Sequence, residues 1–355
     1  MMKKILLGLV AMATLGASCD GVYTVPTAGQ KAAKSVAAGK PLEFSAWLVF
    51  WDPLSIKSFQ ANVGRMKRVY PEAYTCMPSG LPQRIEMVKQ PELAAVVALA
   101  HQHGVKVLGT MNNYAAEVSG FESKRVQKFL HDGPLMEQHV DALIRLAQED
   151  HLDGLDVDYE SLDALDRGAF TGFVRRLAEK CHAQGLKVGV ALHPKTSEPG
   201  VWGGPQAQDY EALGAVVDYF HPMTYDYHWA TGGAGTIAPL SWVRQVIEFA
   251  KSKVPAEKIE MGLNGYGYIW TGKGDTLTWP KFIDLQAKLG KAERDEDGDE
   301  LRLYPAGGEA RMPDAQTARK KFEMAQDLGI NGVAMWVLGQ EDPKTWVEWD
   351  KFTGK

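Results

Sequence analysis

The feature that most constrains this sequence is a joint that recurs along it: an amphipathic helical stretch, a glycine, and then a short apolar run. The joint is clearest in HGVKVLGT (103–110), QGLKVGVAL (184–192) and LGINGVAMW (328–336). In each of them the first glycine stands where a helix C-cap needs a positive φ, and the residues after it favour a strand. A chain that alternates helix, cap and strand in this way is typical of β/α units on a parallel sheet.

Short apolar runs of this kind occur eight times after Pro41, which predicts eight strands. The predicted strands are 44–50, 68–76, 105–111, 153–159, 187–193, 216–224, 258–264 and 331–336. Eight strands with interposed helices, in a segment that runs from residue 41 to residue 355, match the size of a (β/α)8 barrel. A doubly wound open sheet remains an alternative from the pattern alone.

The longest excursion lies between the last two predicted strands, at 271–313. It holds a helical pattern at 282–292 (FIDLQAKLGKA), an acidic turn at 294–300 (RDEDGDE) and a strand-like run at 301–305 (LRLYP). We therefore predict a small subdomain inserted between strands seven and eight of the barrel.

The acidic turn places Asp295, Asp297 and Asp299 at alternate positions, which is a partial match to a calcium-binding loop. However, Gly298 is misplaced for such a loop, and no closing glutamate follows at the required distance. The turn is therefore predicted to be the solvated tip of a hairpin.

The first twenty residues have the order of a secretory signal peptide. Lys3 and Lys4 precede an apolar run that is too short to span a bilayer, and small residues follow it. Cys19 stands where a bacterial lipoprotein signal places its lipidated cysteine, although Gly16 replaces the usual leucine. We therefore predict export, with a lipid anchor favoured over plain secretion.

The division of the chain follows from composition: a signal peptide at 1–19, a linker at 20–40 that is rich in Ala, Gly, Lys and Thr, and a folded domain at 41–355. The net charge is -5, and no cluster of Lys and Arg occurs after the signal peptide. This argues against nucleic acid or an anionic membrane surface as a partner, so the only expected contact with a membrane is the lipid anchor. Cys76 and Cys181 have neither metal-ligand nor redox-motif spacing and are predicted to be buried, with their pairing left open.

The strongest functional signal is DGLDVDYE (153–160), at the fourth predicted strand. Because side chains alternate along a strand, Asp156, Asp158 and Glu160 share one face. Both faces of a barrel strand are normally buried and apolar, so a row of three carboxylates is costly unless it serves a functional site. Glu160 lies at the carboxyl end of the strand, where barrel enzymes place their catalytic groups.

Two other interpretations of this row were weighed. A solvent-facing edge strand would also tolerate three acids, but it would seldom separate them with Leu, Val and Tyr. A metal site would need further ligands from other strands, and His193 is the only obvious candidate at a strand end. We therefore expect no metal and no cofactor.

Taken with the rest of the chain, DGLDVDYE resembles glycoside hydrolase family 18, the chitinases and related endo-N-acetylglucosaminidases, because it has the complete Asp-x-x-Asp-x-Asp-x-Glu pattern of that family. The resemblance covers roughly 41–350 and implies a (β/α)8 barrel. Further similar segments are MNNY (111–114), LHPKTS (192–197), HPMTYDYHW (221–229), GGAGTIAPLSWV (232–243), GLNGYGY (262–268) and AMWVLGQED (334–342), several of which resemble the branch that contains spore-cortex and germination hydrolases. Asn264 departs from the proline that many members have, and the insertion is shorter than in deep-cleft chitinases, which leaves the substrate less certain.

The resemblance also implies roles for single residues. Glu160 would be the general acid and then the base, Asp158 would orient the substrate acetamido group, and Asp156 would share a proton with Asp158. Tyr225 would donate a hydrogen bond to the acetamido oxygen, which acts as the nucleophile in this family and leads to retention. Substrate-binding residues would be Asp226, Met223, Trp336, Tyr266, Trp51 and Asn113, whereas Asp153 would be structural.

The predicted function is therefore hydrolysis of a β-1,4-linked N-acetylglucosamine-containing glycan, such as chitin or a peptidoglycan-type polymer. A non-catalytic carbohydrate-binding lipoprotein on the same barrel is the alternative, and Glu160 argues against it because binding-only proteins commonly lose the acid. Metal-dependent hydrolysis at the same acids is a third hypothesis, and it predicts that chelators abolish the activity.

Overall fold

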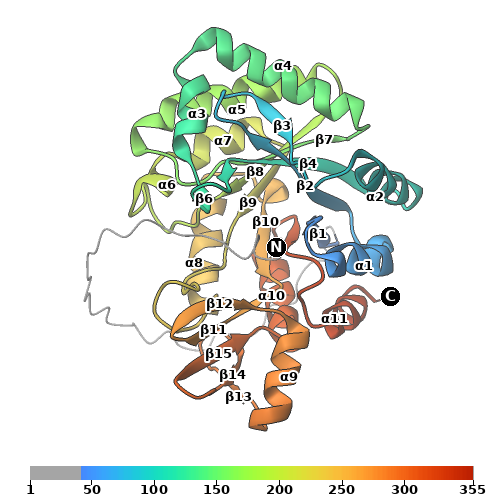
Figure 1. Cartoon of the computed structure of the whole chain (residues 1–355), viewed down its shortest axis with the longest axis vertical. Helices are drawn as coiled ribbons and strands as arrows, with labels where there is room; N and C mark the ends of the chain where they lie inside the picture. Colours follow the sequence, from blue (N-terminus) through green and yellow to red (C-terminus); the bar gives the residue numbers. More distant parts are fainter. Residues whose placement is uncertain (1–40, 355) are drawn as a thin grey trace.

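The computed structural model describes residues 41–354 and consists of a parallel barrel with a subdomain beside it (Figure 1). The eight barrel strands are β1 (Glu43–Leu48), β2 (Arg68–Cys76), β4 (Lys106–Asn112), β7 (Gly154–Asp158), β8 (Lys187–Leu192), β9 (Tyr219–Pro222), β10 (Glu260–Asn264) and β16 (Gly332–Trp336). Each predicted strand overlaps one of them, and they pair in the order β10-β16-β1-β2-β4-β7-β8-β9. The ends of this order meet at one parallel bridge, between Phe220 and Ile259, so the predicted barrel is confirmed.

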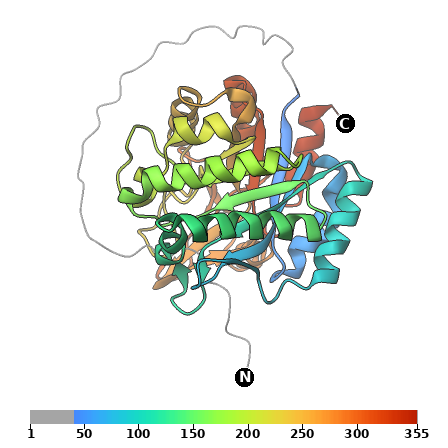
Figure 2. The same cartoon turned by 90° about the horizontal axis from the view of Figure 1, so that it is seen from above.

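The helices lie outside the strands, as Figure 2 shows for the green helices of residues 123–182. They are α1 (Pro53–Asn62), α2 (Gln90–Gln102), α3 (Ser123–Leu130), α4 (Gly133–Glu149), α5 (Arg167–His182), α6 (Gly203–Gln206), α7 (Tyr210–Val216), α8 (Leu240–Lys251), α10 (Ala315–Leu328) and α11 (Lys344–Thr353). Short strands also form in the loops. Strand β3 (Pro82–Arg84) pairs with β2, and β5 (Tyr114–Ala115) pairs with β6 (Gly120–Phe121).

The three predicted helix caps adopt the expected backbone conformation. Gly104, Gly185 and Gly329 have φ values of 69°, 76° and 63°. The Gly329 N–H donates to carbonyls in the last turn of α10, and β16 begins three residues later. A left-handed residue at this point reverses the chain without strain only if it has no Cβ, which is why the glycine marks the joint.

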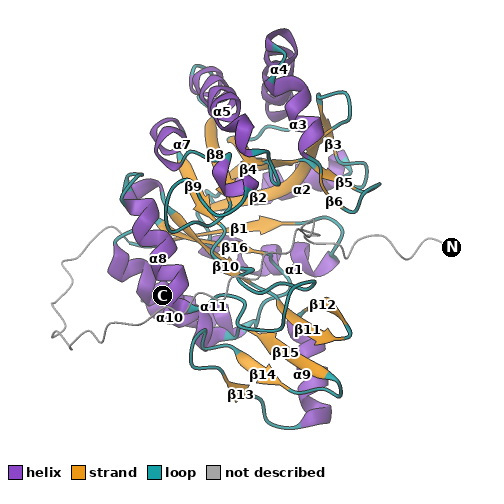
Figure 3. Cartoon of the chain, turned by 90° about the vertical axis from the view of Figure 1, so that its left-hand side faces the viewer, coloured by secondary structure: helices purple, strands orange, loops and turns teal. Residues whose placement is uncertain are grey.

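The insertion between β10 and β16 is an α+β subdomain that projects from the barrel (Figure 3). Its antiparallel sheet has the order β12-β11-β15-β14-β13. The strands are β11 (Gly267–Thr271), β12 (Lys273–Leu277), β13 (Glu293–Arg294), β14 (Leu301–Leu303) and β15 (Gly308–Met312), and helix α9 (Trp279–Leu289) packs Phe282 against them. The predicted subdomain is confirmed, and its helix begins three residues earlier than expected.

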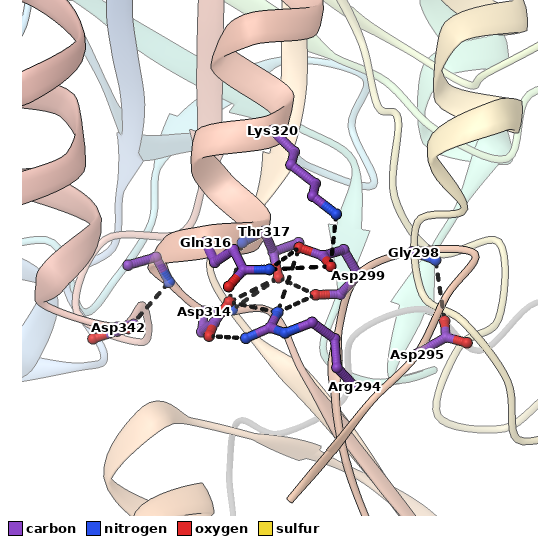
Figure 4. Close-up of polar contacts among 10 residues, drawn as sticks. Arg294, Asp295, Gly298, Asp299, Asp314, Gln316, Thr317, Lys320 and Asp342 are labelled. Atoms are coloured by element: carbon purple, nitrogen blue, oxygen red, sulfur yellow. Dashed lines mark hydrogen bonds and ion pairs between the residues drawn. The ribbon is translucent and has the colours of Figure 1, made fainter.

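The acidic turn at 294–300 is not the solvated tip that the sequence predicted, because it is bound to the start of α10 (Figure 4). Arg294 donates to the Asp314 carboxylate at 2.6 Å, and Lys320 pairs with Asp299 at 2.8 Å. The fully buried Glu300 accepts two backbone N–H bonds from the loop before α8. The hairpin is as predicted, with Glu296 and Asp297 exposed. The expected solvation was wrong for the other charges, because partners from distant parts of the chain satisfy them and spacing within the turn cannot reveal such partners.

The two faces of the barrel strands have different surroundings. Outward-facing strand residues such as Val107, Val157 and Val190 pack with the helices in one large apolar core. The inward-facing residues form only a small apolar cluster around Trp47 and Tyr70, and the remaining inward positions hold buried polar and charged groups. The barrel interior is therefore mostly polar, and an apolar shell surrounds it.

Three further points concern the cysteines, membrane-spanning helices and the amino-terminal segment. Cys76 and Cys181 are both buried and both free, so they form no disulfide. Among residues 41–354, no helix is long and apolar enough to cross a membrane. The signal peptide, the lipidation of Cys19 and the linker fall outside the described residues and stay predictions.

Candidate active site

The three acids of β7 and its extension point into the barrel interior, as the alternation predicted. Their outward neighbours Val157 and Tyr159 lie in the apolar core. Asp156 is fully buried, whereas Asp158 and Glu160 each keep 8% of their surface exposed. The row therefore runs from a sealed interior position to a carboxylate that solvent or a substrate can reach.

Asp156 is bound from its neighbouring strand β4 and from β1 across the barrel interior. Its Oδ2 accepts hydrogen bonds from Trp47 Nε1 at 3.0 Å and from Thr110 Oγ1 at 3.1 Å. On the other side lies Gly189, where an added Cβ would come within 2.7 Å of Asp156 Oδ1. Only glycine leaves room for the carboxylate there, so β8 contributes to the site by lacking a side chain.

Asp158 and Glu160 lie where the charged form is disfavoured. Burial and the charge of Asp156 raise the pKa of Asp158 to about 8. Burial, followed by the charges of Asp158, Asp226 and Glu72, raises the pKa of Glu160 well above its usual value. A carboxyl that stays protonated near neutral pH can act as a general acid, because it still has a proton to donate at a pH at which an ordinary glutamate is ionised.

The main chain of Glu160 is fixed by Asn113. The Glu160 N–H donates to Asn113 Oδ1, and Asn113 Nδ2 donates to the Glu160 carbonyl, both at 2.9 Å. Asn113 is fully buried and uses both ends of its amide in this way. The structure therefore corrects the predicted sugar contact: Asn113 positions the acid and offers no exposed amide to a ligand.

A second group of side chains stands beside the acids, at the end of β9 and the start of the insertion. Tyr225 is buried except for 7% of its surface, and its hydroxyl makes no hydrogen bond to any residue within 41–354. Asp226 accepts hydrogen bonds from the hydroxyls of Tyr266 at 2.6 Å and Tyr268 at 2.9 Å. Burial raises the pKa of Asp226 to about 6 despite these two bonds.

Aromatic side chains complete the surroundings of the acids. Trp336, at the end of β16, contacts Trp47 edge-on, with ring centroids 6.2 Å apart. Trp336 and Met223 are both partly buried and pack against the Tyr225 cluster as well as the Trp47 cluster. The structure thus brings together the acids, Tyr225, Asp226, Met223, Trp336 and Tyr266. Trp51 is half-buried in the loop after β1, and its predicted sugar contact stays a prediction.

A model of the family described as Glycosyl hydrolases family 18 matches residues 117–341, a segment that includes the acid row, Tyr225 and Trp336. This chain belongs to that family. The resemblance that DGLDVDYE indicated is thereby confirmed.

Individual proteins are also similar to this chain in sequence or in fold. The Cortical fragment-lytic enzyme of Bacillus subtilis (strain 168) is 28% identical over 280 residues, which are 75% of this chain and 64% of that protein. The chain therefore spans less than two thirds of that relative. In fold, the chain is similar to the spore cortex-lytic enzyme SleL of Bacillus cereus (TM-score 0.81, 22% identity, 89% of this chain and 75% of that one). It is also similar to a chitinase from Chromobacterium violaceum (TM-score 0.80, 22% identity, 89% and 100%).

The motif's first residue, Asp153, has a separate task in this family 18 chain. Its Oδ2 accepts from the Val107 N–H at 2.9 Å, and Lys106 and His101 pair with the same carboxylate. Asp153 thus ties β7 to β4 at the amino end of the strands, which is the structural hydrogen bonding predicted for it.

Three buried polar residues lie near the acids; sequence reasoning missed Glu72 and His221 and considered His193 only as a possible metal ligand. Glu72 lies beside Asn112 and Asp158, and His193 Nε2 lies 3.8 Å from a Glu160 oxygen while it accepts from the Ser161 N–H. The third, His221, contacts Asp156. A charged or imidazole side chain inside a predicted barrel strand was the available signal for Glu72 and His221.

Proposed function

We propose that this protein is a retaining glycoside hydrolase that cleaves β-1,4-linked N-acetylglucosamine-containing glycans with the help of the substrate's own acetamido group. The observation that supports this most directly is the Glu160 carboxyl, which lies at the carboxyl end of β7, keeps 8% of its surface exposed and has a strongly raised pKa beside Asp158. Family membership supports the same reaction type.

The first half of the reaction breaks the glycosidic bond. The Glu160 carboxyl gives its proton to the leaving oxygen while the acetamido oxygen attacks the anomeric carbon. The free hydroxyl of Tyr225 donates to that acetamido oxygen and holds it in line, and Asp158 accepts from the acetamido N–H. The products of this step are a released glycan end and a cyclic oxazolinium ion, with Glu160 now ionised.

The second half restores the enzyme. The Glu160 carboxylate takes a proton from water as the water oxygen attacks the anomeric carbon and opens the ring. Two inversions at one carbon give net retention, and Glu160 is protonated again. Trp336 supplies an apolar floor for the reacting sugar, and Asp226 closes the pocket from the side of the insertion.

The substrates to be tested are chosen partly from the names of similar proteins, a cortical fragment-lytic enzyme and a chitinase. We propose to incubate the full chain with peptidoglycan, chitin oligosaccharides and an N-glycan, and to follow cleavage by mass spectrometry. Glu160→Gln should cut none of them, because it keeps the shape of the side chain and removes the acid. Asp153→Asn is the matched control, since it removes an acid from the same motif that has no role in the chemistry.

The outcomes separate the three functional hypotheses. Cleavage by the native chain and by Asp153→Asn, but not by Glu160→Gln, supports the proposal and identifies the polymer. Binding of an oligosaccharide without cleavage would replace the hydrolase by a carbohydrate-binding protein. Loss of cleavage in the presence of a chelator would favour metal-dependent hydrolysis.

We also propose that the protein acts outside the cytoplasm, anchored through a lipid on Cys19. The support is the sequence of residues 1–19 alone. Mass spectrometry of the mature amino terminus from a cell-envelope fraction tests it, and an unmodified amino terminus in the culture medium would show plain secretion instead.

A further inference from the structure

His221 lies in the sealed part of the barrel, between two carboxylates. Its Nε2 is 3.5 Å from Asp156 Oδ1, and its Nδ1 is 3.3 Å from Glu260 Oε2. The residue is fully buried, as are Asp156 and Glu260. His221 therefore lies between the acid row of β7 and Glu260, at the amino end of β10.

Both ring nitrogens of His221 face acceptors only. A neutral imidazole has one N–H and one lone pair, so it would direct a lone pair at one of the two ionised carboxylates. The imidazolium ion has a proton on each nitrogen and suits both neighbours. Neither contact has the geometry of a good hydrogen bond, and Asp156 Oδ1 has no other partner, so the attraction is mainly ionic.

The groups that face the ring from other strands supply no competing cation. Trp47 and Tyr70 contact it edge-on, with centroids 5.3 and 4.9 Å away. Gly189 leaves the space between His221 and Asp156 open. Arg68 lies one step further, bound to Glu260.

The count of charges favours the imidazolium. Trp47 and Thr110 both donate to Asp156, which favours its ionised form. With Asp156 and Glu260 as anions and Arg68 as a cation, a charged His221 brings the sum of this buried set to zero. Glu43 also pairs with Arg68, but it lies at the rim with part of its side chain in solvent. A net charge in a sealed, low-dielectric space is strongly unfavourable.

We propose that His221 is a positioning residue, held as an imidazolium ion between Asp156 and Glu260, that keeps Asp156 ionised and leaves the proton of the aspartate pair on Asp158. This proposal rests on the proposed function for its effect on the reaction, but the charge state of His221 can be measured without it.

The environment of the two aspartates agrees with this distribution of charge. Burial raises the pKa of Asp156 overall, but the His221 charge and the bonds from Trp47 and Thr110 reduce the rise. The pKa of Asp158 rises to about 8 through burial and the charge of Asp156, and its Oδ1 has no hydrogen-bond partner. The proton therefore belongs on Asp158 in the free enzyme.

The kinetic test compares His221→Asn with His139→Asn in the full chain. His139 is equally buried, but its ring nitrogens face the Gly80 carbonyl and the Tyr159 hydroxyl, so it is a matched control without a carboxylate. In His221→Asn the acid limb of the pH profile of kcat/KM should move upward by about one pH unit, because Asp156 loses its cation. At the low-pH side this is a loss of about tenfold. His139→Asn should keep the native profile, and a His221→Asn profile parallel to the native one would overturn the proposal.

A spectroscopic test needs no activity and no variant. The chain has nine histidines, of which His139, His193 and His221 are buried. Burial lowers the pKa of His139 to about 4 and that of His193 to about 3, so both are neutral at pH 7. In ¹⁵N NMR of histidine-labelled native protein, we expect one slowly exchanging doubly protonated ring, from His221.

The two measurements separate the possible failures. If every buried histidine ring has an unprotonated nitrogen at pH 7, the proposal about His221 fails whatever the enzyme does. If the imidazolium is found but the native chain cleaves no glycan, the proposed function fails and the charge assignment stands.

Discussion

The barrel interior holds two kinds of buried carboxylate. In its lower part, at the amino ends of the strands, the pKa of a buried carboxylate is lowered, and in its upper part, at their carboxyl ends, it is raised. In the lower part, Glu260 accepts hydrogen bonds from Ser45, Arg68 and Tyr70, and its pKa is about 2. In the upper part, burial and neighbouring acids raise the pKa of Asp158 to about 8. Both carboxylates are almost completely buried.

The difference teaches that burial alone does not determine how a barrel uses an acid. Burial raises the pKa of both groups, but Arg68, followed by His221 and Tyr70, outweighs it at Glu260, whereas another acid adds to it at Asp158. The lower group is therefore a structural ion pair, and the upper group is a proton donor system that is held in an unfavourable state by the surrounding fold.

The largest expected effect is a loss of stability when the ion pair of Glu260 is broken. Glu260→Gln leaves Arg68 buried without its full counter-charge, and we expect the free energy of unfolding to fall by about 3–5 kcal/mol. Urea denaturation measures this. Glu137→Gln, which removes an exposed partner of Arg176, should cost about 1 kcal/mol or less. Equal losses in the two variants would mean that the buried pair is no stronger than a surface pair.

A somewhat smaller effect is expected from Asp158→Asn in the upper part. The variant should lose about a hundredfold in kcat/KM, because a neutral amide accepts from the acetamido N–H more weakly than a carboxylate does. Its thermal midpoint should stay at or above the native value, since a carboxyl in an unfavourable environment has been replaced by a neutral group of the same shape. A clear loss of stability with little loss of rate would assign Asp158 to structure instead.

The effect that is smallest per pH unit is a change in stability with pH. A raised pKa means that the folded state binds more protons, so Asp158 should make the native protein lose stability as pH rises from about 4 to about 8. The lowered pKa of Glu260 works in the other direction and makes stability fall as pH drops below about 4.5. Each titrating group contributes at most about 1.4 kcal/mol per pH unit.

Thermal unfolding measured across this range should therefore show greatest stability in mildly acidic buffer, and Asp158→Asn should flatten the decline on the alkaline side. An alkaline decline that is identical in the variant would show that other groups are responsible for it.

Much of the fold and the central part of the site could be predicted from local patterns. All eight barrel strands follow from apolar runs and caps, and Asp156, Asp158 and Glu160 share a face because strands alternate. The acidic turn and Asn113 could not be predicted correctly, because their partners lie far away in the sequence: Asp314 and Lys320 bind the turn, and Asn113 binds the backbone of Glu160.

By itself, the sequence determined the repeating β/α architecture and the presence of a row of acids at the end of one strand, since both depend on short-range periodicity and on the conformational limits of glycine and the strand. Only the tertiary structure decided which of these acids is ionised. Closure of the barrel places Asp156 next to His221 and Trp47, and Glu260 next to Arg68, while it gives Asp158 and Glu160 acidic neighbours. A carboxyl's charge state depends on donors and charges within a few ångströms, and in this barrel they come from strands that are distant along the chain.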